Sequence, residues 1–154
     1  MSRVSLCIRL LFALCLLAAT FNHLRAALDH GLLWDYGYGA ETPLASRAFW
    51  GSLTLFDPLA ALLLFVRARW GLILTLAIIL LDVLHNSFYV AAHSQWLETF
   101  YLSQVGFGLA VVVLLPWAWR GLALERAATD LAGPAMLGSD TAFFVTPSQK
   151  RSRT

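Results

Sequence analysis

Charged side chains are scarce in this sequence. Lys, Arg, Asp and Glu make up 13% of its 154 residues, against roughly 25% in an ordinary soluble domain. Hydrophobic residues make up 59%, and the mean hydropathy is +0.69. This composition argues against a disordered chain and against a soluble globule, and it indicates an integral membrane protein.

Cysteine and net charge are also low, and each shortage argues against a class of function. The two cysteines, Cys7 and Cys15, lie in the first apolar segment without a C-x-x-C pair. That arrangement argues against a disulfide scaffold and against a thiol redox site. The formal net charge is only +2, and the basic residues do not form one stripe, so we expect no nucleic-acid partner.

Long apolar segments are what the sequence has instead. A helix needs about 20 residues to cross roughly 30 Å of hydrocarbon. Four segments meet this length, at about 10–28, 48–66, 71–92 and 99–119. They predict an all-α fold, an integral membrane four-helix bundle over residues 1–120. A cytoplasmic tail follows at 121–154, expected to be a short helix and then a disordered basic end.

The first segment also has features of a signal peptide, because two arginines precede a short apolar core. Asn22, His23 and Arg25 follow that core directly, without a clean cleavage site. We therefore expect the segment to remain as a span, and cleavage is the alternative.

Basic residues are divided unevenly between the two sides of the predicted membrane domain. With a cytoplasmic N-terminus, nine basic residues lie on that side and only Arg25 and Arg47 on the other. Basic residues accumulate in cytoplasmic loops, so both termini are predicted to be cytoplasmic. We expect a multi-pass protein of a bacterial inner membrane, with the lipid bilayer as its partner. A second copy or another membrane protein is a further candidate partner.

A few polar residues interrupt the apolar segments. Asp57 lies near the middle of the second segment. Asp82, His85 and Asn86 follow one another at i, i+3 and i+4 in the third, so they share one helical face, with Tyr89 one turn further on. The first and fourth segments contribute three more candidates: Asn22, His23 and Gln104.

By residue count, these candidates lie at the membrane centre or in its outer half. The inner half contains almost only aliphatic residues, and Arg9 is expected to extend to the inner surface. An ionisable residue within a bilayer costs a few kcal/mol unless it is paired or faces water. The set therefore predicts an outward-facing polar pocket that binds or transports a small apolar or amphipathic molecule, or protons. The alternative is that these residues only bond one another and fix the packing of the helices.

The long connection between the first two segments, from Asp29 to Arg47, is acidic and aromatic. We interpret it as an ordered cap at the membrane interface, with a lid over a pocket as the alternative.

Four apolar segments with acids at Asp29 and Asp57 and a polar partner at His85 resemble the EXPERA group of sterol isomerases and related ligand-binding proteins. The resemblance covers about residues 10–119. It implies an intramembrane pocket formed by these three residues and an enzyme acting on a lipid or sterol-like substrate. The overall pattern also resembles small bacterial four-helix inner-membrane proteins, which implies no activity. A non-catalytic assembly or structural subunit is therefore a further alternative.

Two histidines lie at matching depth on helices that run in the same direction. His23 and His85 are thus an alternative pair of haem ligands, and Asp57 and Asp82 are alternative ligands of a metal. No ligand-spacing motif supports either arrangement, so we predict no cofactor and no metal.

Overall fold

The computed structural model describes residues 3–137, most of which lie in four helices: α1 (Arg3–His30), α2 (Leu44–Val66), α3 (Ala68–His93) and α4 (Thr99–Leu137). No strand occurs within this range, so the all-α prediction is confirmed. Each predicted span lies inside one of these helices. The most apolar 18-residue stretches have mean hydropathies between 1.7 and 2.3, and all four helices are long and apolar enough to cross a membrane.

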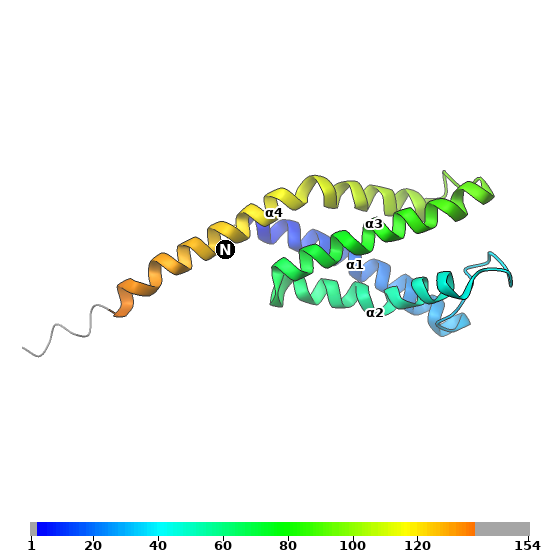
Figure 1. Ribbon diagram of the computed structural model, residues 1–154, viewed down its shortest axis with the longest axis horizontal. Helices are drawn as coiled ribbons and strands as arrows, with labels where there is room; N and C mark the ends of the chain where they lie inside the picture. The colour runs from blue at the N-terminus through cyan, green and yellow to red at the C-terminus, as the bar shows by residue number, and fades with distance from the viewer. Residues whose placement is uncertain (1–2, 138–154) are drawn as a thin grey trace, which may run out of the picture.

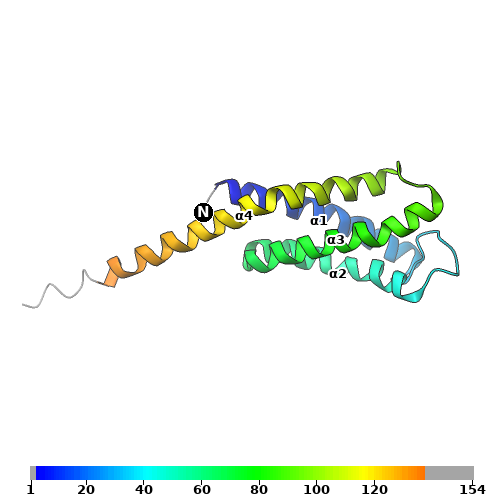
Figure 2. The ribbon, with the colours of Figure 1, turned by 45° about the horizontal axis from the view of Figure 1, so that its top comes forward.

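The helices form an antiparallel bundle in which each packs against two neighbours. α1 contacts α2 and α4, and α3 contacts the same two helices from the other side (Figures 1 and 2). The connections 31–43 and 94–98 lie together at one end, which we call the loop end. The turn at Arg67 lies at the opposite end, near the N-terminus, and we call this the turn end.

Apolar side chains fill the bundle and also cover its outside. Phe12, Leu64 and Val111 are fully buried between the helices. Leu55 and Phe88 point outward and remain 72% and 69% exposed. A continuous apolar surface of this kind is unfavourable in water and suits contact with lipid.

The turn between α2 and α3 consists of a single residue outside both helices, and it depends on a close backbone contact. Gly71 lies where a Cβ atom would approach the carbonyl carbon of Leu63 to 2.6 Å and would also overlap the backbone of Leu64. Real Cβ atoms do not approach backbone this closely, so the first turn of α3 packs against α2 only because residue 71 is glycine.

The fourth helix continues well beyond its predicted span. α4 passes through Gly121 without a break and ends at Leu137, so it projects beyond the other helices at the turn end (Figures 1 and 2). The residues after Gly121 are mostly Ala, Leu, Glu and Arg, which favour helix, and one glycine costs only about 1 kcal/mol. The expected basic end at 138–154 lies outside the described residues.

Arg9 corrects the expectation of an arginine that extends to the surface. Its side chain is only 4% exposed, and its Nη1 donates a hydrogen bond of 3.1 Å to the carbonyl oxygen of Leu64. Nε donates to the Ser5 carbonyl at 3.4 Å, and Nη2 lies 4.0 Å from Oε1 of Glu125. The last carbonyls of a helix lack partners in their own helix and carry partial negative charge, so they stabilise a cation. The turn-end half of the bundle is therefore not purely aliphatic.

Candidate functional site

The connection 31–43 is an ordered segment that folds over the loop end. At its centre, the amide of Tyr38 donates to the carbonyl of Asp35 at 3.1 Å, and the amide of Gly37 donates to the Asp35 carboxylate at 2.9 Å. Tyr36 and Gly37 have φ values of +55° and +85°, the positive pair typical of a type I′ turn. A left-handed conformation costs a non-glycine residue about 1 kcal/mol or more, and such residues cluster at functional sites.

Tyr36 reaches from this turn to a buried acid. Its hydroxyl and Nδ1 of His23 share a hydrogen bond of 2.8 Å, and Nε2 of His23 lies 3.9 Å from Oδ2 of Asp57. Asp57 is only 2% exposed. Burial, and then the negative charges of Asp82 and Asp57, raise the pKa of Tyr36 to about 12. A chain of polar groups therefore joins the loop to the carboxyl group on α2, with a phenol that stays protonated at neutral pH.

A second polar network joins three helices through Asn86. The indole Nε1 of Trp50 donates to Oδ1 of Asn86 at 2.8 Å. The amide nitrogen of Asn86 donates to Oδ1 of Asp82 at 2.9 Å and to Oε1 of Gln104 at 3.0 Å. Trp50, Asp82 and Asn86 are all buried. Because both amide hydrogens of Asn86 are used, this network holds α2, α3 and α4 in one relative position.

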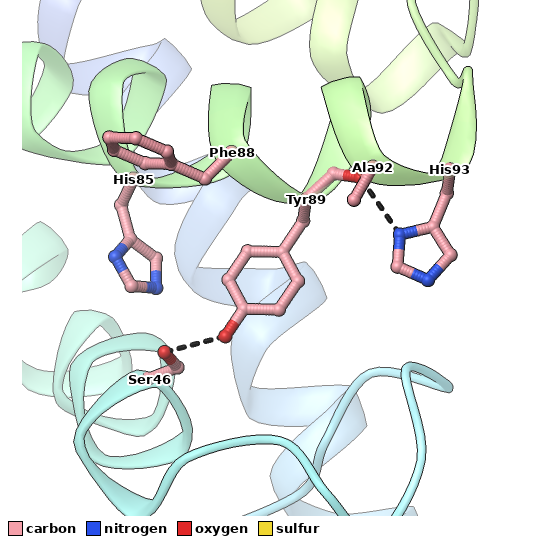
Figure 3. A pocket seen from close by; sticks show the side chains of 6 residues that line it. All are labelled: Ser46, His85, Phe88, Tyr89, Ala92 and His93. Carbon is pink, nitrogen blue, oxygen red and sulfur yellow. Dashed lines mark hydrogen bonds between the residues drawn. The ribbon is translucent and has the colours of Figure 1, made fainter.

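A cleft of about 360 Å³ opens beside this network, between α2 and α3 at the loop end (Figure 3). It is lined by Ser46, His85, Phe88, Tyr89, Ala92 and His93. The side chains of His85 and Tyr89 point from α3 toward Ser46 on α2, and the Tyr89 hydroxyl donates to Oγ of Ser46 at 2.7 Å. Nε2 of His85 is buried and has no hydrogen-bond partner among the described residues. A buried polar atom of this kind, beside a cleft within the size range of ligand pockets, suggests a missing partner.

Trp50 contacts both the lining of the cleft and the polar networks. Its ring lies 5.4 Å from that of His85 and 4.9 Å from that of Tyr89, both of which line the cleft. Its ring also lies 5.2 Å from that of Tyr36, which bonds to His23. Trp50 therefore links the lining of the cleft to the network around Asp82, because its indole also donates to Asn86.

Trp50 and Tyr36 were missed as site residues by the sequence reasoning. Trp50 lies near a predicted membrane boundary, where tryptophan is common, and Tyr36 lies in the predicted cap. One signal was available for Trp50. It precedes Asp57 by seven residues on the same helix, and that spacing places both on one face.

Two of the predicted residues, Asn22 and Asp29, lie outside these networks. Asn22 is exposed on the outside of α1. The side chain of Asp29 is 57% exposed and pairs with Arg25 at 3.7 Å, so the two acids implied by the EXPERA resemblance do not share a pocket.

The two histidines considered as haem ligands also have separate surroundings. No hydrogen bond or ring contact joins His23 to His85, both of which the structure describes. In the described part of the chain, no group of three or more His, Cys, Asp or Glu side chains is arranged to hold a metal ion.

The carboxyl groups have few basic neighbours. Among the described side chains, His23 is the only basic group within 4.0 Å of Asp57 or Asp82. The middle of the bundle therefore holds two buried acids, and among the described side chains one imidazole lies within 4.0 Å of them.

Comparisons with known proteins found no match to a family model, to a curated protein or to a solved structure.

Proposed function

We propose that the protein binds a small amphipathic cation in the loop-end half of the bundle. The observation that carries the proposal is the pair of buried carboxyl groups, Asp57 and Asp82, with only His23 as a basic neighbour among the described residues. Ionised carboxylates are costly within a bilayer unless an opposite charge compensates them. A bound cation would supply that charge.

The surroundings of the carboxyl groups support a cation with an apolar part. The ring of Trp50, whose indole donates to the network around Asp82, lies within 6 Å of the rings of Tyr36, Tyr38 and Tyr89. The faces of such rings attract cations. Phe88 and the methyl group of Ala92 line the neighbouring cleft and offer an apolar wall. We assign the apolar part of the ligand to the cleft and its charged part to the side of the cleft that faces Trp50 and the network around Asp82.

The proposed orientation is that of a multi-pass protein of a bacterial inner membrane, with the loop end outside and both termini in the cytoplasm. The uneven distribution of arginine supports this orientation. The loop end also carries Asp29, Asp35, Glu41 and Glu98. These acids would raise the local concentration of cations at the entrance.

The chain from Tyr36 through His23 to Asp57 offers a path for protons between the loop and the buried acid. Proton exchange coupled to cation binding is therefore part of the proposal. It would let the site release a proton when a cation arrives and take one up when the cation leaves.

The test uses two probes of nearly the same shape. Phenyltrimethylammonium carries a positive charge, and tert-butylbenzene is its uncharged carbon analogue. We expect calorimetric titration of the protein in lipid nanodiscs to give saturable binding of the ammonium compound only. Asp82→Asn should weaken that binding by about tenfold or more, because one charge at short range is worth several kcal/mol at an intermediate dielectric.

Asp29→Asn is the matched control, because it removes the same charge from an exposed position at the same end. We expect it to change the affinity by less than about twofold, since water and salt screen exposed charges. Equal binding of the charged and uncharged probes, or equal effects of the two substitutions, would refute the proposal.

A structural role is a second candidate for part of the set. The hydrogen bonds from Trp50 through Asn86 to Gln104 connect three helices, which favours a function in fixing their packing. If this is their only role, Asp82→Asn should lower stability without changing the affinity for phenyltrimethylammonium.

A further inference from the structure

The turn end holds a second cleft, remote from the networks described above and independent of the proposed function. Its volume is about 800 Å³. It lies between the α2–α3 turn and the part of α4 that begins at Trp119, with Arg9 of α1 also in its wall. Its charged lining residues are Arg9, Arg67, Arg69, Glu125 and Arg126. Four arginines and one glutamate give the cleft a formal charge of +3.

Two guanidinium nitrogen atoms at this cleft lack a hydrogen-bond partner among the described residues. Nη2 of Arg9 and Nε of Arg69 are both buried, and neither makes a hydrogen bond to the described part of the chain. Arg9 as a whole is only 3% exposed. Buried N–H groups almost always have an acceptor, and those of a charged guanidinium are the most costly to leave without one. The carboxylate of Glu125 lies 4.0 Å from Nη2 of Arg9, which is too far for a hydrogen bond. The two N–H groups therefore point to a further acceptor with negative charge in this cleft.

The geometry of the arginines suits an oxyanion. The guanidinium carbon of Arg69 lies 5.7 Å from the ring centre of Trp119, which holds the side chain against the indole. A fixed guanidinium presents planar N–H donors that match the oxygens of phosphate. Glu125 adds a negative charge close to Arg9, so the cleft favours a singly charged phosphodiester over a doubly charged free phosphate.

The remaining lining residues indicate that the phosphodiester belongs to a lipid. Phe65, Ile73 and Leu122 give the cleft an apolar side. Trp70, which is 66% exposed, and Trp119 lie close to the ends of the spanning segments, where indoles favour the headgroup region. We infer that this cleft binds an anionic phospholipid, with its phosphate held by Arg69, Arg126 and Arg9 and its acyl chains against the apolar side.

The test measures which lipid stays bound to the full-length protein. The protein is purified from vesicles that contain equal amounts of phosphatidylglycerol and phosphatidylcholine, and native mass spectrometry then counts the lipid that is retained. We expect one molecule of phosphatidylglycerol to be retained in preference to phosphatidylcholine. In Arg69→Gln/Arg126→Gln the preference should fall about 25-fold, at about fivefold for each arginine removed.

The matched control is Arg120→Gln, which removes an exposed arginine of the same helix that does not line the cleft. We expect it to change the preference by less than about twofold. Arg126→Gln alone provides a second variant at an exposed position, where folding does not depend on the side chain. It should give about a fivefold loss.

Three results would overturn the inference. These are equal retention of the two lipids, an equal loss in the Arg120 and Arg126 variants, and displacement of phosphatidylglycerol by millimolar inorganic phosphate. The last result would assign the cleft to a phosphate compound from solution and not to a lipid.

Discussion

Replacing Asn86 with leucine should destabilise the folded protein by about 2 kcal/mol. The substitution removes three hydrogen bonds, of which those to Trp50 and Asp82 are buried and that to Gln104 is partly buried. Hydrogen bonds between side chains in membrane proteins contribute about 0.6 kcal/mol on average and about 1.7 kcal/mol at most. Three such bonds give an expected loss of about 2 kcal/mol and an upper limit of about 5 kcal/mol.

Asn22→Leu is the matched control for this prediction. It makes the same chemical change on the exposed outside of α1, where leucine suits contact with lipid. We expect this variant to be as stable as the wild type or slightly more stable. Because helix propensity and side-chain hydropathy change equally in both variants, their difference isolates the hydrogen bonds of Asn86.

The assay is reversible unfolding of the purified protein in mixed micelles by increasing proportions of sodium dodecyl sulfate, followed by circular dichroism. The quantity compared is the free energy of unfolding of the two variants. A difference below about 0.5 kcal/mol, which is the scatter expected for unrelated sites, would show that the network around Asn86 does not stabilise the bundle.

Two further predictions concern the turn end and the loop. Gly71→Ala should lower the free energy of unfolding by about 2 kcal/mol, because the added methyl group would overlap the backbone of Leu64 and force α2 and α3 apart. Unchanged thermal stability of this variant would contradict the prediction. Since the pKa of Tyr36 rises to about 12 in the folded protein while an exposed tyrosine ionises near 10, its ionisation should cost stability as the pH increases from about 10 to 12. In Tyr36→Phe, the loss of stability between about pH 10 and 12 should be absent. The variant should also lack a tyrosinate absorbance step near pH 12. If the step persists in the variant, it belongs to another tyrosine.

The four helices could be predicted from the sequence because the signal is local and long. A run of about 20 apolar residues has one stable form within a bilayer, which is a helix that satisfies its own backbone. Helical periodicity also correctly placed Asp82 and Asn86 side by side, and their side chains are bonded at 2.9 Å. The end of α4 could not be located in this way, because a hydropathy pattern marks where a helix leaves the membrane and not where it stops.

Other features required the contacts between helices. Asn22 and Asn86 are the same residue type in similar apolar segments, yet one faces outward and the other bonds to three side chains. Periodicity determines which residues share a face but not which face meets a neighbour. The contact between Tyr36 and His23 could not be predicted for a different reason. Tyr36 lies in a loop, and the direction of its side chain depends on a turn with positive φ values.

Arg9 shows most clearly what the sequence determines and what the tertiary structure determines. The sequence alone determined that this arginine lies near the end of a helix long and apolar enough to cross a membrane, because charge and hydropathy are properties of each residue in order. Only the tertiary structure decided that it is buried, because the carbonyl of Leu64 and the carboxylate of Glu125 come from helices distant in the chain. A charge in an apolar environment is stabilised by the groups that surround it, and in this bundle those groups are brought together only by the packing of α1 against α2 and α4.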